Sequence, residues 1–420
     1  LREAVDAMQN YHISLTARVV IPVAAVIIAP CFLGFALRRR LRKPPVKERM
    51  ATVCGCLFLL ILAVLTIYRS NALYESFKTS NYYNHVSSYN EKGFPYSFLH
   101  AMTSYPVDKP EGYNRDEAQK WDEEKTVQDE HLPVHVVVVM NEAFSALSEN
   151  DAFAYTREND PMENFHRLEQ DHNAISGRTV VPGLGGGTAN TEFDVLTGMQ
   201  SDALSPSTSI AFGSVERNLD SLFRVFDADR YVTSFVHPGV SWFYARENTY
   251  QRLGVDVQVY ADEMQEIEYR GTWPTDDSLA SFVEDMFAST AASGDLELTY
   301  ITTFQNHMSY TLDKYGEGCT FPNLEASVPL SQEAQELLTV YMDGIRDADA
   351  MLGKLTDYFE GLEEPVLLLF FGDHMPSLGT DQFVYDELGI EIPTTAGDGP
   401  EYFYAYATPW LLWTNDAGAN

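Results

Sequence analysis

The clearest strand signal in the chain is Val134-His-Val-Val-Val-Val-Met140, a run of β-branched residues without polar alternation. Such a run is typical of a strand that is buried on both faces of a sheet. Further strands are predicted at 231–236, 296–303 and 365–371, and helical spacing of apolar residues separates them, most clearly at 332–363. Strands that alternate with helices predict an α/β fold, in which a mostly parallel central sheet is flanked by helices.

Charged side chains stand directly after two of these strands. Glu142 follows the strand at 134–140, and Asp373 and His374 follow the strand at 365–371. Ligands of parallel α/β sheets bind beyond the carboxyl ends of the strands, so we expect these three side chains at one edge. Two carboxylates and an imidazole suit a divalent metal ion of hard to borderline character. Each residue alone also has a structural interpretation, because apolar strands often end in a charged residue.

A glycine-rich turn supplies a hydroxyl group, in Gly183-Leu-Gly-Gly-Gly-Thr-Ala-Asn-Thr-Glu-Phe-Asp-Val-Leu-Thr-Gly198. Glycines let the backbone turn sharply, and Thr188 follows them where a helix is predicted to start, at 189–197. The positive end of a helix favours phosphate oxygens, so Thr188 is a candidate nucleophile toward a phosphoryl group held by the metal. The alternative is an ordinary glycine-rich strand-to-helix turn. We expect Glu192 to support this turn.

The order of these motifs resembles the lipoteichoic acid synthase family. The motifs are strand-Asn-Glu142, Gly-Gly-x-Thr188 with a following Glu-Phe, Asn-His307, and strand-Gly-Asp373-His374. The resemblance covers about 134–413 and includes the closing Tyr406-Ala-Thr-Pro-Trp-Leu-Leu-Trp413. Members of this family are membrane-anchored phosphoglycerol transferases of the sulfatase and alkaline phosphatase superfamily, so the resemblance implies that fold and activity.

The resemblance also implies a metal centre. Four residues match the family's metal ligands, namely Glu142, Thr188, Asp373 and His374, and Thr188 matches the nucleophile as well. The implied ion is Mn²⁺, with Mg²⁺ as the alternative.

Substrate-binding residues follow from the same resemblance. His307 in Phe304-Gln-Asn-His-Met-Ser-Tyr310 matches a histidine that contacts the glycerol phosphate group, and Arg246 matches the arginine that holds it. His237, nine residues before Arg246, matches a histidine that lines the site. Read singly, these residues have structural interpretations too, because most arginines lie on the surface and most lone histidines are hydrogen-bonded parts of the fold.

Two departures from the family concern this substrate site. The family reads Trp-x-Arg where the chain has Tyr244-Ala-Arg246, with Trp242 two places earlier, and we include both aromatic residues in the predicted site. An aspartate expected shortly after His237 is replaced around Gly239. The metal centre therefore matches the family better than the substrate pocket does.

The implied reaction transfers glycerol phosphate in two steps. Thr188 attacks phosphatidylglycerol or a similar membrane phospholipid, and a polyglycerol phosphate or glycolipid acceptor then takes the group from the threonine. A metal-dependent phosphodiesterase, a phosphoethanolamine transferase and a membrane-tethered binding domain with an inactive site remain as alternatives. Sulfatase chemistry is not expected, because no Cys/Ser-x-Pro-x-Arg sequence surrounds Thr188.

Two uncharged apolar stretches predict a membrane region at 1–69, with transmembrane helices at about 19–37 and 50–68. The loop at 38–49 between them carries seven basic residues and one acidic residue, which places it on the cytoplasmic side. We therefore expect a multi-pass protein of the cell membrane, with a connector at 70–132 and an extracellular catalytic domain at 133–420. Further spans before the first residue would fit this interpretation.

The charge of the chain argues against one class of partner, and its cysteine content indicates the type of source organism. Residues 71–420 hold 18 basic and 58 acidic residues, a balance that argues against nucleic acid as a partner because phosphates would be repelled. Cys319 is the one cysteine after residue 70, so the catalytic domain has no internal disulfide and no cysteine-rich zinc site. This composition favours a bacterium without an oxidising periplasm, of the Gram-positive type.

Overall fold

The computed structural model describes the chain from residue 134 onward almost continuously. The described ranges there are 134–204, 210–226, 229–316, 319, 325–393 and 400–419. Before them it describes 91–104, 112–120 and short pieces between 45 and 77. Contacts divide the chain into two compact units, one of residues 1–79 and 86–105 and one of residues 80–85 and 106–420.

The first unit contains α6 (Phe94–Ser104), whose His100 ring stacks on Tyr74 at a centroid distance of 3.9 Å. No helix in the described part of the chain has the length and apolar character needed to cross a bilayer. The predicted transmembrane helix at 19–37 lies outside the described residues, and so does most of the one at 50–68. Both helices, and the division into membrane region, connector and catalytic domain, stay predictions.

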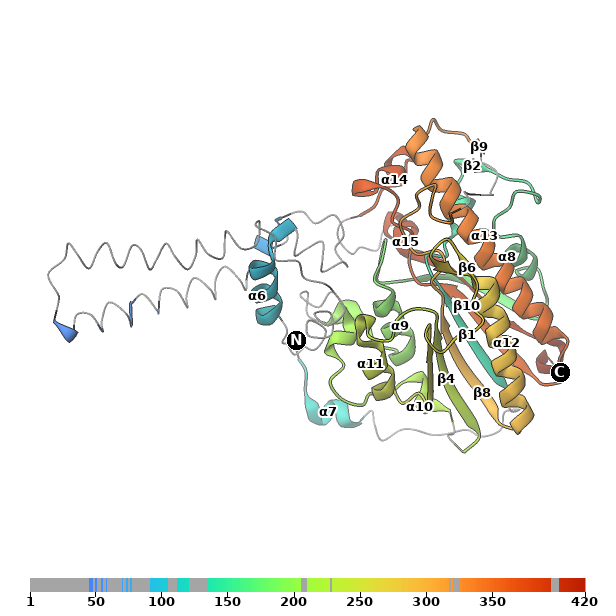
Figure 1. The fold of residues 1–420 in the computed structure, drawn as a ribbon, viewed down its shortest axis with the longest axis horizontal. Coiled ribbons are helices and arrows are strands. Elements are labelled where there is room, and N and C mark those ends of the chain that lie inside the picture. Colours follow the sequence, from blue (N-terminus) through green and yellow to red (C-terminus); the bar gives the residue numbers. More distant parts are fainter. Residues whose placement is uncertain are drawn as a thin grey trace. The chain divides into compact units, whose positions relative to one another are not determined.

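The second unit is built on one sheet of seven strands, shown in Figure 1. Only β11 runs antiparallel to the other six strands, so the predicted α/β class and the mostly parallel sheet are confirmed. In order across the sheet, the strands are β3 (Ala174–Val180), β11 (Ala407–Thr414), β10 (Val366–Gly372), β1 (His135–Asn141), β8 (Leu296–Thr302), β4 (Tyr231–His237) and β5 (Val257–Tyr260).

Helices cover both faces of this sheet (Figure 1). The described α-helices of this unit are α7 (Arg115–Lys120), α8 (Glu163–Leu168), α9 (Thr188–Thr197), α10 (Leu222–Val225), α11 (Arg246–Leu253), α12 (Asp276–Ser293), α13 (Gln332–Glu360), α14 (Phe383–Glu387), α15 (Pro400–Tyr406) and α16 (Asp416–Ala419). Short strand pairs lie outside the sheet, namely β2 (Phe153–Ala154) with β9 (Glu325–Ala326), and β6 (Tyr269–Arg270) with β7 (Trp273–Pro274).

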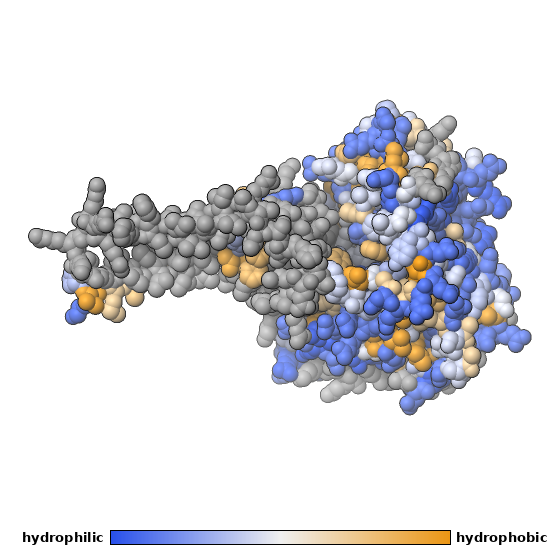
Figure 2. Space-filling model, viewed as in Figure 1, coloured by the Kyte–Doolittle hydropathy of each residue, from blue (hydrophilic) through white to orange (hydrophobic). Residues whose placement is uncertain are grey.

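The side chains of β1 explain why two helix layers form. Val137 and Val139 join the apolar core beneath α12 and α13, while Val136, Val138 and Met140 join the core beneath α9, α10 and α11. Successive side chains of a strand point to opposite faces, so an uninterrupted apolar strand needs helices on both sides. Hydrophilic residues cover much of the outer surface of this unit in the view of Figure 2.

Candidate active site

Two neighbouring strands bring the predicted metal ligands together. β1 and β10 pair in parallel with Asn141 opposite Gly372, so the residues that follow leave the sheet side by side. Glu142, Asp373 and His374 are buried there, and their ligand atoms all lie within 4.8 Å of one another. Among the residues that the structure describes, no other group of three His, Cys, Asp or Glu residues is arranged for a metal ion.

The hydrogen bonds of this acid cluster fit a divalent cation. His374 Nδ1 lies 2.9 Å from the Met375 carbonyl, which makes Nδ1 the protonated nitrogen and leaves Nε2 as a lone-pair ligand. Nε2 lies 3.5 Å from Glu142 Oε1 and 3.3 Å from Asp373 Oδ2. Asp373 Oδ2 is buried and has no hydrogen-bond donor. Three acceptor atoms that face one another without a donor are the arrangement a cation would neutralise.

Burial has an electrostatic consequence for Glu142. Desolvation, and after it the nearby charge of Asp373, raises the pKa of the Glu142 carboxyl to about 8. Asp373 is held by its other oxygen, Oδ1, which accepts the Ala143 N–H at 2.7 Å. Ala143 has a left-handed backbone with φ of 52°, a conformation that is uncommon for alanine and often found at functional sites.

The glycine-rich turn ends beside the residues that follow β10. Gly185, Gly186 and Gly187 have φ values of 70°, 148° and 97°, so each has a backbone conformation that favours glycine. Gly185 N–H donates to the Met375 carbonyl at 2.8 Å, and α9 then begins at Thr188. One turn later, the Thr191 hydroxyl donates to the Asp373 carbonyl at 2.8 Å. The start of α9 is therefore fixed to the end of β10, with Thr188 as its first residue.

Arg246 and Glu192 form a buried ion pair. Arg246 Nη2 lies 2.6 Å from Glu192 Oε1, and Arg246 Nε lies 3.2 and 3.3 Å from the two carboxylate oxygens. The Tyr250 hydroxyl donates to Glu192 Oε2 at 2.6 Å. Burial opposes the charge of Arg246, but Glu192 outweighs it and raises the arginine pKa. The expectation that Glu192 merely supports the turn is thus incomplete, because its carboxylate binds Arg246.

The aromatic residues before Arg246 form a tight turn. Tyr244 and Ala245 have φ of 57° and 55°, and the Arg246 guanidinium carbon lies 5.1 Å from the Tyr244 ring centroid. Trp242 packs edge-on against Phe243 at 5.9 Å between centroids. The structure therefore connects Tyr244 with Arg246, while the role predicted for Trp242 in the substrate site stays a prediction.

His307 lies in a cluster that the sequence did not indicate. Its ring stacks on Trp273, with centroids 5.5 Å apart and planes inclined by 23°. Lys314 Nζ lies 3.9 Å from the Trp273 ring centroid and donates to the His307 carbonyl. Burial lowers the pKa of Lys314 to about 7, against the opposing charges of Glu142 and Asp276. Lys314 follows His307 by seven residues in an irregular segment, so no local pattern marks it.

His237 is buried at the end of β4, and its surroundings explain one departure from the family. Its Nδ1 lies 2.9 Å from the Thr302 carbonyl, and its ring meets Phe304 edge-on at 5.6 Å. A Cβ atom on Gly239 would lie 2.3 Å from His237 Nε2. The histidine occupies the space of a side chain at position 239, so an aspartate does not fit there in this conformation.

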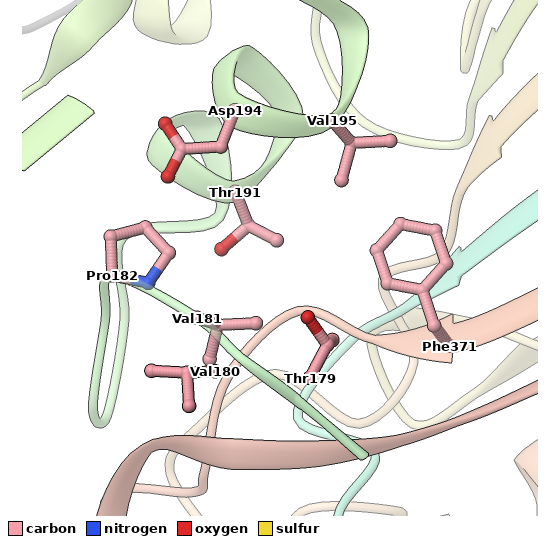
Figure 3. A pocket seen from close by; sticks show the side chains of 8 residues that line it. All are labelled: Thr179, Val180, Val181, Pro182, Thr191, Asp194, Val195 and Phe371. Carbon is pink, nitrogen blue, oxygen red and sulfur yellow. The ribbon is translucent and has the colours of Figure 1, made fainter. Parts of the chain in front are cut away.

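A pocket of about 200 Å³ lies between α9, the end of β3 and the end of β10, and is shown in Figure 3. It is lined by Thr179, Val180, Val181, Pro182, Thr191, Asp194, Val195 and Phe371. None of the three residues of the acid cluster lines it. We therefore place the candidate chemistry at the acid cluster, where the charged and hydrogen-bonding groups meet.

Comparisons with known proteins identify the family of the chain. The family model described as Sulfatase matches residues 134–420. A protein of Rhizobium meliloti (strain 1021), described as a candidate cyclic beta-1,2-glucan modification protein, is 27% identical over an alignment of 355 residues that covers 80% of this chain. The chain spans 50% of the length of that relative.

Two solved structures share the fold. The Streptococcus pyogenes phosphoglycerol transferase GacH, in complex with sn-glycerol-1-phosphate, gives a TM-score of 0.58 at 19% identity and covers 74% of this chain and 78% of its own. The lipoteichoic acid synthase LtaP from Listeria monocytogenes gives a TM-score of 0.50 at 16% identity, with coverages of 67% and 65%.

Proposed function

The chain belongs to the sulfatase family, and from this premise we propose that it is a metal-dependent phosphoglycerol transferase. The proposed donor is phosphatidylglycerol or a similar membrane phospholipid, and the proposed acceptor is a lipoteichoic-acid-type chain or another glycan or glycolipid. The two structural neighbours support glycerol phosphate as the transferred group, since one carries sn-glycerol-1-phosphate and the other is a lipoteichoic acid synthase. The Rhizobium relative supports a glycan as acceptor.

One observation carries the proposal. The acid cluster of Glu142, Asp373 and His374 presents acceptor atoms alone, and Thr191 fixes the start of the helix that carries Thr188 to the carbonyl of Asp373. A threonine at a positive helix end beside a divalent-cation site suits attack on a phosphodiester. Mn²⁺ is the proposed ion and Mg²⁺ the alternative; when bound, the ion would lower the pKa of the threonine hydroxyl and neutralise charge on the phosphoryl oxygens.

In the first step, Thr188 Oγ1 forms a bond to phosphorus, and the bond between phosphorus and the diacylglycerol oxygen breaks. The proton lost by Thr188 is balanced by the proton that the leaving diacylglycerol gains. In the second step, the oxygen of an acceptor hydroxyl forms the new bond to phosphorus, and the bond between phosphorus and Thr188 Oγ1 breaks. The proton lost by the acceptor hydroxyl is balanced by the proton that Thr188 regains. Arg246, whose charge Glu192 sustains, is assigned to hold the phosphate oxygens through its planar guanidinium.

His307 is assigned to accept a proton at Nε2. Its Nδ1 lies 2.8 Å from the Met308 carbonyl, so Nδ1 is the protonated nitrogen and Nε2 has the lone pair. Burial lowers the pKa of His307, which keeps the ring neutral and able to accept a proton at neutral pH. His237, Tyr244 and Trp242 complete the proposed substrate site.

The proposed location follows from the N-terminal sequence. Two membrane helices at about 19–37 and 50–68, with the basic loop between them in the cytoplasm, would hold the catalytic domain outside the cell next to its lipid donor. Membrane attachment, the extracellular side and a Gram-positive source are parts of this proposal.

The decisive experiment compares Thr188→Ala and Thr188→Ser in the full chain with Mn²⁺ and phosphatidylglycerol labelled in its glycerol headgroup. We expect a covalent glycerol phosphate adduct in the wild type, a weaker one in Thr188→Ser and none in Thr188→Ala. Transfer that continues undiminished in Thr188→Ala would refute the assignment. Label released only as free glycerol phosphate would favour the phosphodiesterase, and labelled phosphatidylethanolamine used in preference would favour the phosphoethanolamine transferase.

A further inference from the structure

The Arg246–Glu192 pair is placed where a buried cation is costly for two reasons. Arg246 is 2% exposed, and taking a guanidinium out of water is unfavourable unless a counter-charge is present. It is also the first residue of α11, where the positive end of the helix dipole repels a cation. A cation at such a position would not persist without a specific partner, and Glu192 supplies it.

Glu192 does not lie next to Arg246 in the sequence but on the helix of the proposed nucleophile. Thr188 and Glu192 are four residues apart on α9, so their side chains project from the same face of the helix, one turn apart. The carboxylate is completely buried and is held a second time by the Tyr250 hydroxyl. Glu192 therefore joins α9, which carries Thr188, to α11, which carries Arg246.

The geometry of the pair also selects the direction of the guanidinium. Nε and Nη2 both face Glu192, which leaves Nη1 as the nitrogen that the pair does not engage. The charge of Arg246 acts on the acid cluster and on His307, since it lowers the pKa of Glu142 and of His307, although other causes dominate both shifts. The cation that Glu192 holds is thus close enough to the proposed active site to influence it electrostatically.

We propose that Glu192 is a positioning residue, which fixes the guanidinium of Arg246 relative to Thr188 so that both meet the same phosphate group. This inference rests on the proposed function, because it requires a phosphate ligand beside Thr188. Glu192 acts through Arg246 and does not itself touch the substrate, whose phosphate it would repel. A purely structural ion pair would instead stabilise the fold without any specific effect on phosphate affinity.

A double-mutant cycle separates these two roles. The proteins are the wild type, Glu192→Gln, Arg246→Ala and the double variant, each as the full chain with saturating Mn²⁺. The measurement is the affinity for glycerol phosphate by calorimetry, with the affinity for Mn²⁺ as the control. We expect Glu192→Gln to weaken glycerol phosphate binding by about tenfold in the wild type, the scale of one charge-assisted hydrogen bond, and by less than twofold when Arg246 is already alanine. Mn²⁺ affinity should change by less than twofold.

Equal losses in both backgrounds, or no loss in either, would overturn the inference. If Glu192→Gln does not fold, Tyr250→Phe replaces it, because it keeps both charges and removes one hydrogen bond to the carboxylate. A twofold to fourfold loss that disappears in the Arg246→Ala background then supports the role, and an equal loss in both backgrounds contradicts it. A wild type that binds Mn²⁺ but no glycerol phosphate would refute the proposed function itself. Equal losses in both backgrounds, with wild-type binding intact, would refute only the positioning role of Glu192.

Discussion

Replacing Glu142 by glutamine is expected to stabilise the metal-free protein at pH 8 while it weakens metal binding. The pKa of the folded Glu142 carboxyl is about 8, against 4.5 for the ordinary side chain, so the folded state binds an additional proton between these values. Stability contributed by that proton is complete below about pH 4.5 and is lost as the pH rises toward 8. At about 1.4 kcal/mol for each pKa unit, the loss reaches at most about 5 kcal/mol.

Glutamine has the shape of the protonated glutamate and cannot ionise, so the variant lacks this loss. Its amide can donate a hydrogen bond to Asp373 Oδ2, as the O–H of the protonated glutamate can. The two metal-free proteins should therefore be similar in stability at pH 5. The advantage of the variant over the wild type should then grow progressively from pH 5 to pH 8.

Urea unfolding in EDTA at pH 5, 6, 7 and 8 measures this difference directly, and the same series with 1 mM Mn²⁺ measures the effect of the metal. Comparison with the wild type at each pH removes the contributions of other buried carboxyl groups. With Mn²⁺ the advantage of the variant at pH 8 should shrink, since an ion at 100 times its dissociation constant stabilises the wild type by about 2.7 kcal/mol and the variant by less. A metal-free variant that is no more stable than the wild type at pH 8 would refute the electrostatic account of the acid cluster.

Three further substitutions test the surroundings of the cluster. Gly239→Asp, which restores the residue expected from the family, should lower the free energy of unfolding by about 1–3 kcal/mol in thermal or urea unfolding, because its Cβ would overlap His237; an unchanged stability would show that the loop moves freely. Lys314→Met should reduce transfer about tenfold with unchanged Mn²⁺ affinity, because the ammonium group that binds the His307 carbonyl is lost; wild-type turnover in the transfer assay would contradict this. Thr191→Val should cost about 1 kcal/mol of stability and also slow transfer, since it removes the hydrogen bond between α9 and the end of β10; a loss of stability with full activity would separate the helix position from catalysis.

The sequence pattern was sufficient to predict those parts of the molecule that depend on local periodicity and on where strands end. The apolar run of β1 and the residues after β1 and β10 predicted the sheet and the acid cluster, because parallel neighbouring strands must end at one edge. The edge strand β3 was not predicted, since most of its side chains are exposed and its alternation of polar and apolar residues is irregular.

The partners of Arg246 and His307 could not be predicted for a physical reason. Glu192 is 54 positions from Arg246, and Lys314 reaches the His307 carbonyl only because the irregular segment after β8 folds back on itself. Such contacts depend on tertiary packing and leave no periodic signal in the sequence. The tyrosine and alanine with positive φ before Arg246 were likewise unpredictable, because neither residue type favours that conformation.

The pairing of β1 with β10 also has a consequence for biosynthesis. Ala143 and Asp373, which follow the two strands, are 230 positions apart, so β1 leaves the ribosome long before the strand that covers one of its edges exists. Until then the N–H and C=O groups along that edge of the apolar strand are open to incorrect pairing, which is a known aggregation hazard for nascent chains. Metal capture by all three cluster residues must follow the insertion of β10. The rate of Mn²⁺ uptake during refolding would thus report a late folding event, and a chaperone that shields β1 would be expected to raise the yield of active protein.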